Sequence, residues 1–155
     1  LARVPAAPPT RKNHRATSCP APISANAPYM DWSRLSCSAF SCVLSTGRRL
    51  THYHTRTQTG RCVGLNEILG EETADISPED AKALSIADGE MIKVSSRRGE
   101  VTVKAKVTEQ VPKGLVWMAF HFRETCANWL TNAAFDTITK TAEYKACAVK
   151  VEKIT

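Results

Sequence analysis

The sequence has 155 residues, of which 43% are hydrophobic and 23% are charged, so neither a wholly disordered chain nor a bundle of membrane helices fits. No stretch approaches the roughly 20 consecutive apolar residues that a spanning helix needs, and the length favours one domain with one core. The formal net charge of +6 would suit binding to nucleic acid or other phosphates. Whether it indicates such a partner depends on where the basic residues lie in the chain.

The N-terminal quarter of the chain differs from the rest in charge and in proline content. Residues 1–44 contain five basic residues against a single acid, Asp31, and residues 5–28 contain six of the eight prolines. A stretch with this composition and no sustained apolar period cannot bury enough surface to offset the entropy of ordering it. We therefore expect residues 1–41 to be a disordered or loosely attached tail and residues 42–155 to form the folded domain.

No targeting signal is clear in this tail. Its Arg- and Ser-rich start is similar to an organelle transit peptide, but the tail lacks a clear amphipathic helix and the apolar region of about 7 to 15 residues that a secretory signal requires. We expect a cytoplasmic protein without membrane insertion. The start at Leu1 rather than Met also suggests a fragment of a longer chain.

The six cysteines are even in number, but no C-x-x-C pair occurs. This pattern argues against a zinc ribbon and against a redox motif. Cys147 lies in an apolar run and Cys42 borders one, so we expect both thiols to behave as small core residues.

The folded part begins with a short apolar run. Residues 42–44 predict a strand that leads into a loop over residues 45–49. Further along, Ser77 can cap a helix, Pro78 suits its first position, and the acids that follow favour its positive end. These signals predict a short helix that ends at about Leu84.

Two turns then separate two predicted strands. Asp88 and Gly89 predict a turn before a strand over residues 91–95. After a second tight turn at residues 97–99, residues 101–107 alternate strictly between apolar and polar side chains. This alternation is typical of a half-buried strand with one wet face.

The last third of the chain adds further strands. Residues 111–114 have the chemistry of a turn, and residues 115–120 form an apolar run that fits a strand covered on both faces. Residues 146–151 are a final candidate strand. The fold class is therefore mainly β, a compact barrel or sandwich with one or two short helices.

The densest polar stretch covers residues 46–61. It contains four arginines, two histidines and five threonines in 16 residues. Arginine forks match phosphate oxygens, threonine hydroxyls and loop amides add neutral donors, and Gly47 lets a backbone approach closely. This composition favours an anion-binding loop, although an ordinary solvated loop would have the same composition. His52 and His54 form a pair with no third ligand nearby, which is weak evidence for a metal.

Other polar candidates are ambiguous when each is taken alone. His121 follows a buried strand and could face a ligand, but a partly buried histidine bonded to the backbone is the more common case. Asn128 could contact a base edge or cap a turn, and Tyr144 with Lys145 precedes the final strand. The chain lacks the P-loop and G-x-G-x-x-G phosphate-binding motifs, the G-x-S-x-G elbow and the H-E-x-x-H helix.

Taken together, five blocks in chain order resemble one known family. From about Cys42 to Ile154 the chain is similar to the C-terminal molybdopterin-dinucleotide-binding domain of the molybdenum or tungsten oxidoreductases, and within them to the catalytic subunit of formate dehydrogenase. The blocks are Leu44-Ser45-Thr46-Gly47-Arg48-Arg49 with His52-Tyr53-His54-Thr55-Arg56-Thr57; Ile76-Ser77-Pro78-Glu79-Asp80-Ala81 with Ile86-Ala87-Asp88-Gly89; Val94-Ser95-Ser96-Arg97-Arg98-Gly99; Phe120-His121-Phe122 with Asn128-Trp129-Leu130-Thr131; and Ile138-Thr139-Lys140-Thr141-Ala142-Glu143-Tyr144-Lys145 with Cys147-Ala148-Val149.

The resemblance implies a double-psi β-barrel that binds and orients a bis(molybdopterin guanine dinucleotide) carrying Mo or W, in an enzyme that converts formate to carbon dioxide by two-electron transfer. The metal ligand and iron-sulfur cysteines of such enzymes lie in other domains, so the implied partners are the 4Fe-4S and metal-binding domains. This chain itself is expected to supply no metal ligand and to be inactive alone. The residues that match cofactor-binding positions are Thr46, Gly47, Arg48, Arg49, His52, Tyr53, His54, Thr55, Thr57, His121, Asn128, Tyr144 and Lys145.

Two other functions remain open at this point. Similar barrels serve as protein-interaction modules in the N-domains of AAA-type ATPases, but that function leaves the paired histidines without a purpose. A nucleic-acid binder is the third possibility. The basic excess lies mostly in the proline-rich tail, and the body of the chain lacks the interleaved aromatic and basic residues of a stacking platform, so no nucleic-acid partner is expected.

Overall fold

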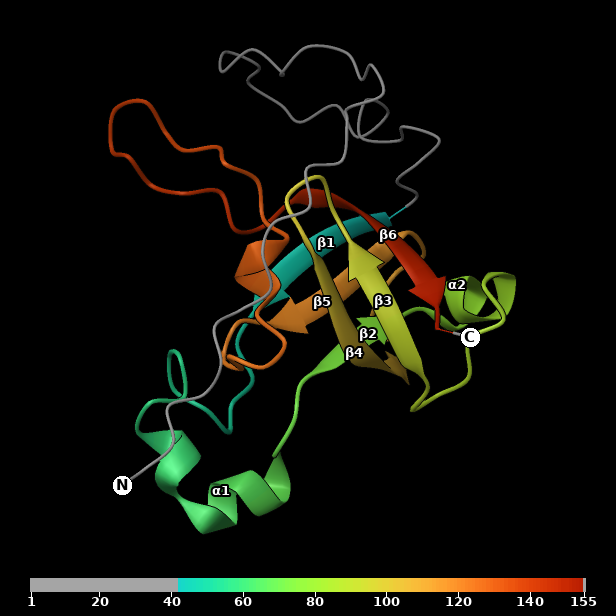
Figure 1. Cartoon of the computed structure of the whole chain (residues 1–155), viewed down its shortest axis with the longest axis horizontal. Helices are drawn as coiled ribbons and strands as arrows, with labels where there is room; N and C mark the ends of the chain where they lie inside the picture. Colours follow the sequence, from blue (N-terminus) through green and yellow to red (C-terminus); the bar gives the residue numbers. More distant parts are fainter. Residues whose placement is uncertain (1–41, 155) are drawn as a thin grey trace, which may run out of the picture. The chain divides into compact units, whose positions relative to one another are not determined.

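The computed structural model describes residues 42–154, so the predicted tail of residues 1–41 lies outside the described residues. Six strands close into a barrel in the order β1-β5-β2-β4-β3-β6 (Figure 1). The strands are β1 (Cys42–Gly47), β2 (Thr73–Ile76), β3 (Met91–Ser95), β4 (Glu100–Val107), β5 (Leu115–Ala119) and β6 (Cys147–Lys153).

The pairing scheme of the barrel has an internal two-fold pattern. β1 pairs with β5 in parallel, with Val43 opposite Leu115, and β2 pairs with β4 in parallel, with Thr73 opposite Lys104. The other four pairs are antiparallel. Exchanging β1, β2 and β3 with β4, β5 and β6 leaves this scheme unchanged. A closed six-stranded barrel with two parallel strand pairs related in this way is a double-psi β-barrel. The structure therefore confirms the expected fold.

The core fills the barrel from alternate positions of its strands. Val101, Val103 and Ala105 are buried while their neighbours in β4 are exposed or half-buried, as the alternation predicts. β5 was predicted to be covered on both faces, but only one face is buried. Leu115 and Trp117 are only half-buried, because one face of a barrel strand points to the core and the other points outward.

The predicted helix is present as α2 (Pro78–Ala83). Ser77 is its N-cap, and the Ser77 hydroxyl accepts a hydrogen bond from the Asp80 amide at 3.1 Å. The sequence patterns missed β2 and the short α1 (Val63–Ile68). Helix α1 has no buried residue, so no apolar period marks it in the sequence.

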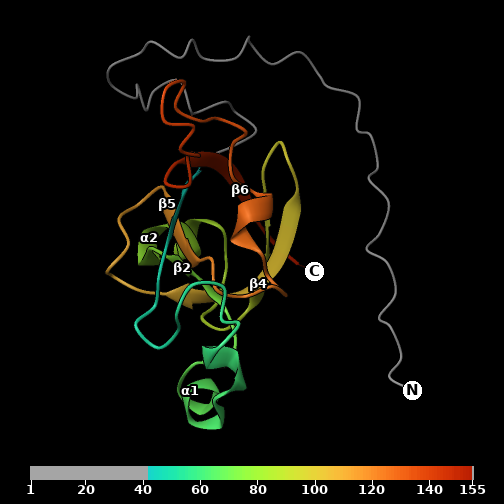
Figure 2. The same cartoon turned by 90° about the vertical axis from the view of Figure 1, so that its left-hand side faces the viewer.

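Two segments project from the barrel in opposite directions in both views, α1 in one and residues 131–146 in the other (Figures 1 and 2). The second segment is held together by an isolated bridge between Phe135 and Ala142. Cys42 and Cys147 are buried, as predicted. Within residues 42–154, no helix has the length and apolar character needed to cross a membrane.

Candidate functional site

The end of β1 is tied to the last part of the chain. β1 extends to Gly47, so Thr46 lies within the strand rather than in the predicted loop, and it is 1% exposed. Its hydroxyl donates to the Tyr144 carbonyl at 2.6 Å, and Lys145 Nζ donates to the Thr46 carbonyl at 2.6 Å. The structure therefore brings Thr46, Tyr144 and Lys145 together, and their contact with a cofactor stays a prediction.

Gly47 has a structural role that the sequence did not reveal. A Cβ atom at Gly47 would lie 2.6 Å from Cζ2 and 2.9 Å from Nε1 of Trp117. These separations are shorter than real Cβ contacts, because the indole covers the glycine directly. The missing side chain makes room for Trp117, whereas we had expected it to make room for a ligand.

Arg49 is committed to internal contacts. Its guanidinium donates to Asp75 at 2.8 and 3.2 Å and to the Thr73 hydroxyl at 2.8 Å, lies 3.6 Å from the Glu72 carboxylate, and stacks over Trp117 at 4.6 Å. These contacts give Arg49 a structural role, and its direct contact with an anion stays a prediction. Its side chain positions the loop, since a guanidinium fork already paired with a buried carboxylate has few donors left.

His121 fixes the path of the loop after β1. It is 1% exposed; its Nε2 accepts from the Arg49 amide at 2.9 Å, and its Nδ1 donates to the His54 carbonyl. Both ring nitrogens therefore bond to backbone, the more common case foreseen for an isolated histidine. His54 and Arg56 have left-handed φ angles of 44° and 62°, and such strained positions persist where surrounding contacts hold them.

His52 likewise braces the loop. It is 5% exposed; its Nε2 donates to the Leu69 carbonyl at 2.6 Å, and its Nδ1 accepts from Thr59 at 3.1 Å. His52 and His121 therefore hold the loop through their ring nitrogens, and contact of either residue with a ligand stays a prediction. No cluster of three or more potential metal ligands occurs among residues 42–154.

The remaining predicted loop residues point into solvent. Arg48, Tyr53, His54, Thr55 and Thr57 are exposed. Because the histidines and Arg49 hold the backbone beneath them, these exposed side chains are presented on a fixed surface.

A cavity of about 270 Å³ opens beside this surface, and we call it the arginine cavity. Sequence reasoning did not select Arg61 or Arg123, although Arg61 ends the dense polar stretch and Arg123 follows His121 by two positions. Both arginines could have been found from the sequence, because each is a basic residue close to a predicted site residue. The cavity is lined by Thr55, Arg56, Thr57, Gly60, Arg61, His121, Arg123 and Glu124.

Asn128 is the predicted residue that the structure does not join to this surface. It lies exposed in the turn η3 (Ala127–Trp129), and its carbonyl accepts from Thr131 at 3.0 Å. Within the described range 42–154, no hydrogen bond links it to the loop after β1. Its role in binding stays a prediction.

Comparison with known proteins decides between the functions that the sequence left open. The family model described as "Molydopterin dinucleotide binding domain" matches residues 42–148. The chain belongs to this family. This molybdopterin dinucleotide-binding domain is thus of the kind found in formate dehydrogenase-like and nitrate reductase-like oxidoreductases, which confirms the cofactor family that the resemblance implied.

Relatives of this molybdopterin dinucleotide-binding domain are large enzymes. The chain is 48% identical over 126 residues to the F420-dependent formate dehydrogenase subunit alpha of Methanocaldococcus jannaschii, covering 81% of this chain and 19% of that one. It is 43% identical to a nitrate reductase of Symbiobacterium thermophilum, covering 81% and 17%, and 40% identical to formate dehydrogenase H of Escherichia coli, covering 74% and 16%. The chain spans about a fifth of the length of these relatives.

A solved structure supports the fold. The acetylene hydratase of Pelobacter acetylenicus superposes with a TM-score of 0.61 at 15% identity, covering 76% of this chain and 19% of that one. At this identity the match concerns the barrel alone.

Proposed function

We propose that this domain binds the phosphate-bearing part of a bis(molybdopterin guanine dinucleotide) through the arginine cavity and the exposed loop beside it. The observation that carries the proposal is the clustering of arginine and threonine donors around a cavity of about 270 Å³. Pyrophosphate oxygens accept several charge-assisted hydrogen bonds at once, and arginine forks match them in geometry.

The exposed and buried residues have different tasks in this proposal. Thr55, Thr57, Arg61 and Arg123 would donate to phosphate oxygens, and Arg48 would add charge at the rim. Thr46, Arg49, His52 and His121 would keep the loop in the required shape from beneath. Fixed donors lose little entropy on binding, so the positioning residues contribute to affinity without touching the ligand.

Tyr53, His54, Asn128, Tyr144 and Lys145 complete the proposed set. The first two are exposed in the loop, and the last two are tied to it through Thr46. Contact between these side chains and the pterin part of the cofactor is proposed from the family pattern, with Asn128 the least supported by geometry.

The larger enzyme is also part of the proposal. We infer that the chain acts as the C-terminal domain of a cytoplasmic formate dehydrogenase-like enzyme together with 4Fe-4S and metal-binding domains. The bound molybdenum or tungsten centre would supply the two-electron chemistry that converts formate to carbon dioxide. Relatives named as formate dehydrogenases support formate as the substrate, whereas the nitrate reductase relative is the main alternative.

Guanosine diphosphate tests the proposal, because it carries the base and the pyrophosphate without the metal. Added to the isotope-labelled full chain, it should shift the backbone amide signals of residues 53–61 and of Arg123. Guanosine without phosphate should shift them little. Equal responses to the two compounds, or shifts confined to the opposite end of the barrel, would overturn the phosphate assignment.

Single substitutions then identify the donors. Arg61→Ala and Arg123→Ala should each weaken guanosine diphosphate binding by roughly five- to tenfold, because each removes a charge-assisted contact, and Arg48→Ala should weaken it less. Arg97→Ala is the matched control, since Arg97 is an exposed arginine in the turn between β3 and β4. If Arg97→Ala weakens binding as much as Arg123→Ala, the effect is one of net charge alone and the cavity is the wrong site.

A further inference from the structure

One polar side chain connects the short helix α1 to the arginine cavity. Asn66 Oδ1 accepts a hydrogen bond from Arg56 Nη2 at 3.0 Å, and Asn66 Nδ2 donates to the Gly60 carbonyl at 2.8 Å. Arg56 and Gly60 both line the arginine cavity, so this pair of hydrogen bonds, which we call the Asn66 bridge, joins two parts of its wall. Helix α1 has no buried residue, so packing in the core does not account for it.

The Asn66 bridge requires an amide side chain. The guanidinium of Arg56 only donates hydrogen bonds and the carbonyl of Gly60 only accepts them, so the group between them must accept at one end and donate at the other. A reversed amide would place its NH₂ group against the guanidinium and its oxygen against the carbonyl. Asn66→Asp would therefore lose one of the two hydrogen bonds, and Asn66→Ala would lose both.

The backbone between Arg56 and Gly60 forms a tight turn. The Arg56 amide donates to the Tyr53 carbonyl at 3.0 Å, and the Gly60 amide donates to the Arg56 carbonyl at 2.8 Å. Arg56 has a left-handed φ of 62°, which costs free energy in a residue other than glycine. A Cβ atom at Gly60 would lie only 3.0 Å from Cγ of Arg56. The Asn66 bridge links the same two residues through a side chain, so it stabilises this close and strained turn.

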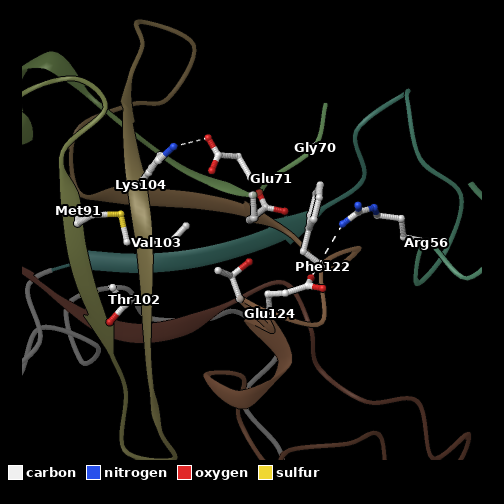
Figure 3. A pocket seen from close by; sticks show the side chains of 11 residues that line it. Arg56, Gly70, Glu71, Met91, Thr102, Val103, Lys104, Phe122 and Glu124 are labelled. Atoms are coloured by element: carbon white, nitrogen blue, oxygen red, sulfur yellow. Dashed lines mark hydrogen bonds and ion pairs between the residues drawn. The ribbon is translucent and has the colours of Figure 1, made fainter. Parts of the chain in front are cut away.

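The Arg56 guanidinium has further partners within the protein. Its Cζ lies 4.6 Å from the centroid of the Phe122 ring, and its Nη1 lies 4.0 Å from the Glu124 carboxylate. Figure 3 shows the side chain turned toward Phe122 and Glu124, where it also lines a second cavity of about 390 Å³. The side chain is 19% exposed. With these partners the guanidinium fixes the cavity wall, and the proposed phosphate donors are its neighbours in the loop.

We propose that Asn66 is a positioning residue for phosphate binding, which fixes the turn of residues 56–60 so that Thr57 and Arg61 are presented to the arginine cavity. Donors that are already held in place lose little entropy on binding, so the bridge should raise affinity although Asn66 does not touch the ligand. Helix α1 then has a role, which is to hold Asn66 beside the turn. For its ligand this inference rests on the proposed function, whereas the ordering of the turn is testable without any ligand.

Amide hydrogen exchange of the isotope-labelled full chain tests the bridge without ligand. In Asn66→Ala the amides of Arg56 and Gly60 should exchange at least about tenfold faster than in the parent. Asn66→Asp should have a smaller effect, because it still accepts from Arg56. Gln58→Ala is the matched control, since Gln58 is an exposed amide in the same turn whose side chain makes no capping hydrogen bond. Unchanged exchange in Asn66→Ala, or equal acceleration in Gln58→Ala, would overturn the proposal.

Titration with guanosine diphosphate then tests the effect on binding. Asn66→Ala should weaken the affinity roughly fivefold, whereas Gln58→Ala should leave it unchanged. The urea midpoint of Asn66→Ala should equal that of the parent, because α1 has no residue in the core. A purely structural role of Asn66 would give the opposite pattern, a lower midpoint with parental affinity, and that result would contradict the assignment.

A double-mutant cycle shows whether Asn66 acts through Arg56. In the Arg56→Ala background, Asn66→Ala should weaken binding by about twofold or less, because the main partner of the Asn66 oxygen is already gone. An undiminished fivefold loss in that background would show that the two residues act separately and would refute the bridge. If the parent itself does not bind guanosine diphosphate, the phosphate assignment of the arginine cavity fails, while the exchange rates still decide whether Asn66 orders the turn.

Discussion

Nη2 of Arg49 lies 2.8 Å from Oδ1 of Asp75, while the neighbouring Arg48 projects into solvent from the same loop. The Arg49 side chain is 16% exposed and that of Asp75 is 7% exposed. The two adjacent arginines therefore have opposite roles, Arg49 in the architecture and Arg48 at the surface. A binding assay alone would not tell them apart, but a stability measurement does.

Arg49→Ala should lower the free energy of unfolding by about 3 kcal/mol, because it leaves the Asp75 carboxylate buried without its partner. Arg48→Ala should lower it by less than about 1 kcal/mol, since it removes only an exposed contact with Phe120. Urea unfolding of both variants at pH 7 measures the difference. Equal losses in the two variants would mean that the Arg49–Asp75 pair does not stabilise the fold.

Glu72 should make stability depend on pH. Its folded-state pKa of about 7 lies above the ordinary value of 4.5 because the carboxyl group is desolvated, so the folded protein holds this proton more tightly than the unfolded chain. The associated stability is fully present below about pH 4.5 and is lost as the pH rises through 7. Between pH 5 and pH 8 the loss from this group should reach roughly 2.5 kcal/mol.

Urea unfolding across this pH range checks the prediction. Glu72→Gln should remove the Glu72 part of the slope, because glutamine does not titrate. Glu71→Gln, whose parent side chain is 63% exposed in an ion pair with Lys104, should leave the slope as it is. A parent slope that persists in Glu72→Gln would show that other groups cause it.

Gly47→Ala should destabilise the barrel by about 1 to 3 kcal/mol, because the added methyl group overlaps the Trp117 ring. Gly64→Ala is the matched control. A Cβ at Gly64 in α1 meets nothing within 4 Å, so this change should be neutral or slightly stabilising. In the Trp117→Phe background the cost of Gly47→Ala should fall, and purely additive losses would refute the steric explanation.

The thiols should differ in reactivity. Burial raises the pKa of Cys147 to about 11, and its thiol donates to the Leu130 carbonyl at 2.7 Å, whereas Cys62 is exposed. At pH 8, iodoacetamide should therefore label Cys62 within minutes and Cys147 only after unfolding. Mass spectrometry of the digested protein measures both. Equal labelling in the folded state would show that β6 opens at its start.

Much of the barrel was predictable from local patterns. The alternation from residue 101 to 107 marked the inward face of β4, and Ser77 with Pro78 marked the start of α2. These signals work because strand alternation and helix capping depend on residues close together in the chain. β2 was missed because its four residues, Thr73–Ile76, include the polar Asp75. The burial of Asp75 is explained only by its ion pair with Arg49, which the sequence does not show.

The candidate site was predictable in composition but not in the roles of its residues. Residues 46–61 have a composition that favours anion binding, and the family resemblance implied that the cofactor binds there. The polar stretch could not reveal that His52 and His121 face the backbone, nor that Asn128 lies apart in η3. Glu72 carried no signal at all, because an acidic residue before a short strand is usually solvated.

The sequence by itself determined the family and most core-facing positions and singled out the region proposed to bind the cofactor, since each depends on residue types and their local order. Only the tertiary structure decided which donors remain open. Arg49 meets Asp75 across 26 positions, His121 meets Arg49 across 72 and Thr46 meets Tyr144 across 98. A polar side chain can bind a ligand only if its hydrogen-bonding groups are not already paired with residues distant in the sequence. Closure of the barrel determines which distant residues come close enough to pair.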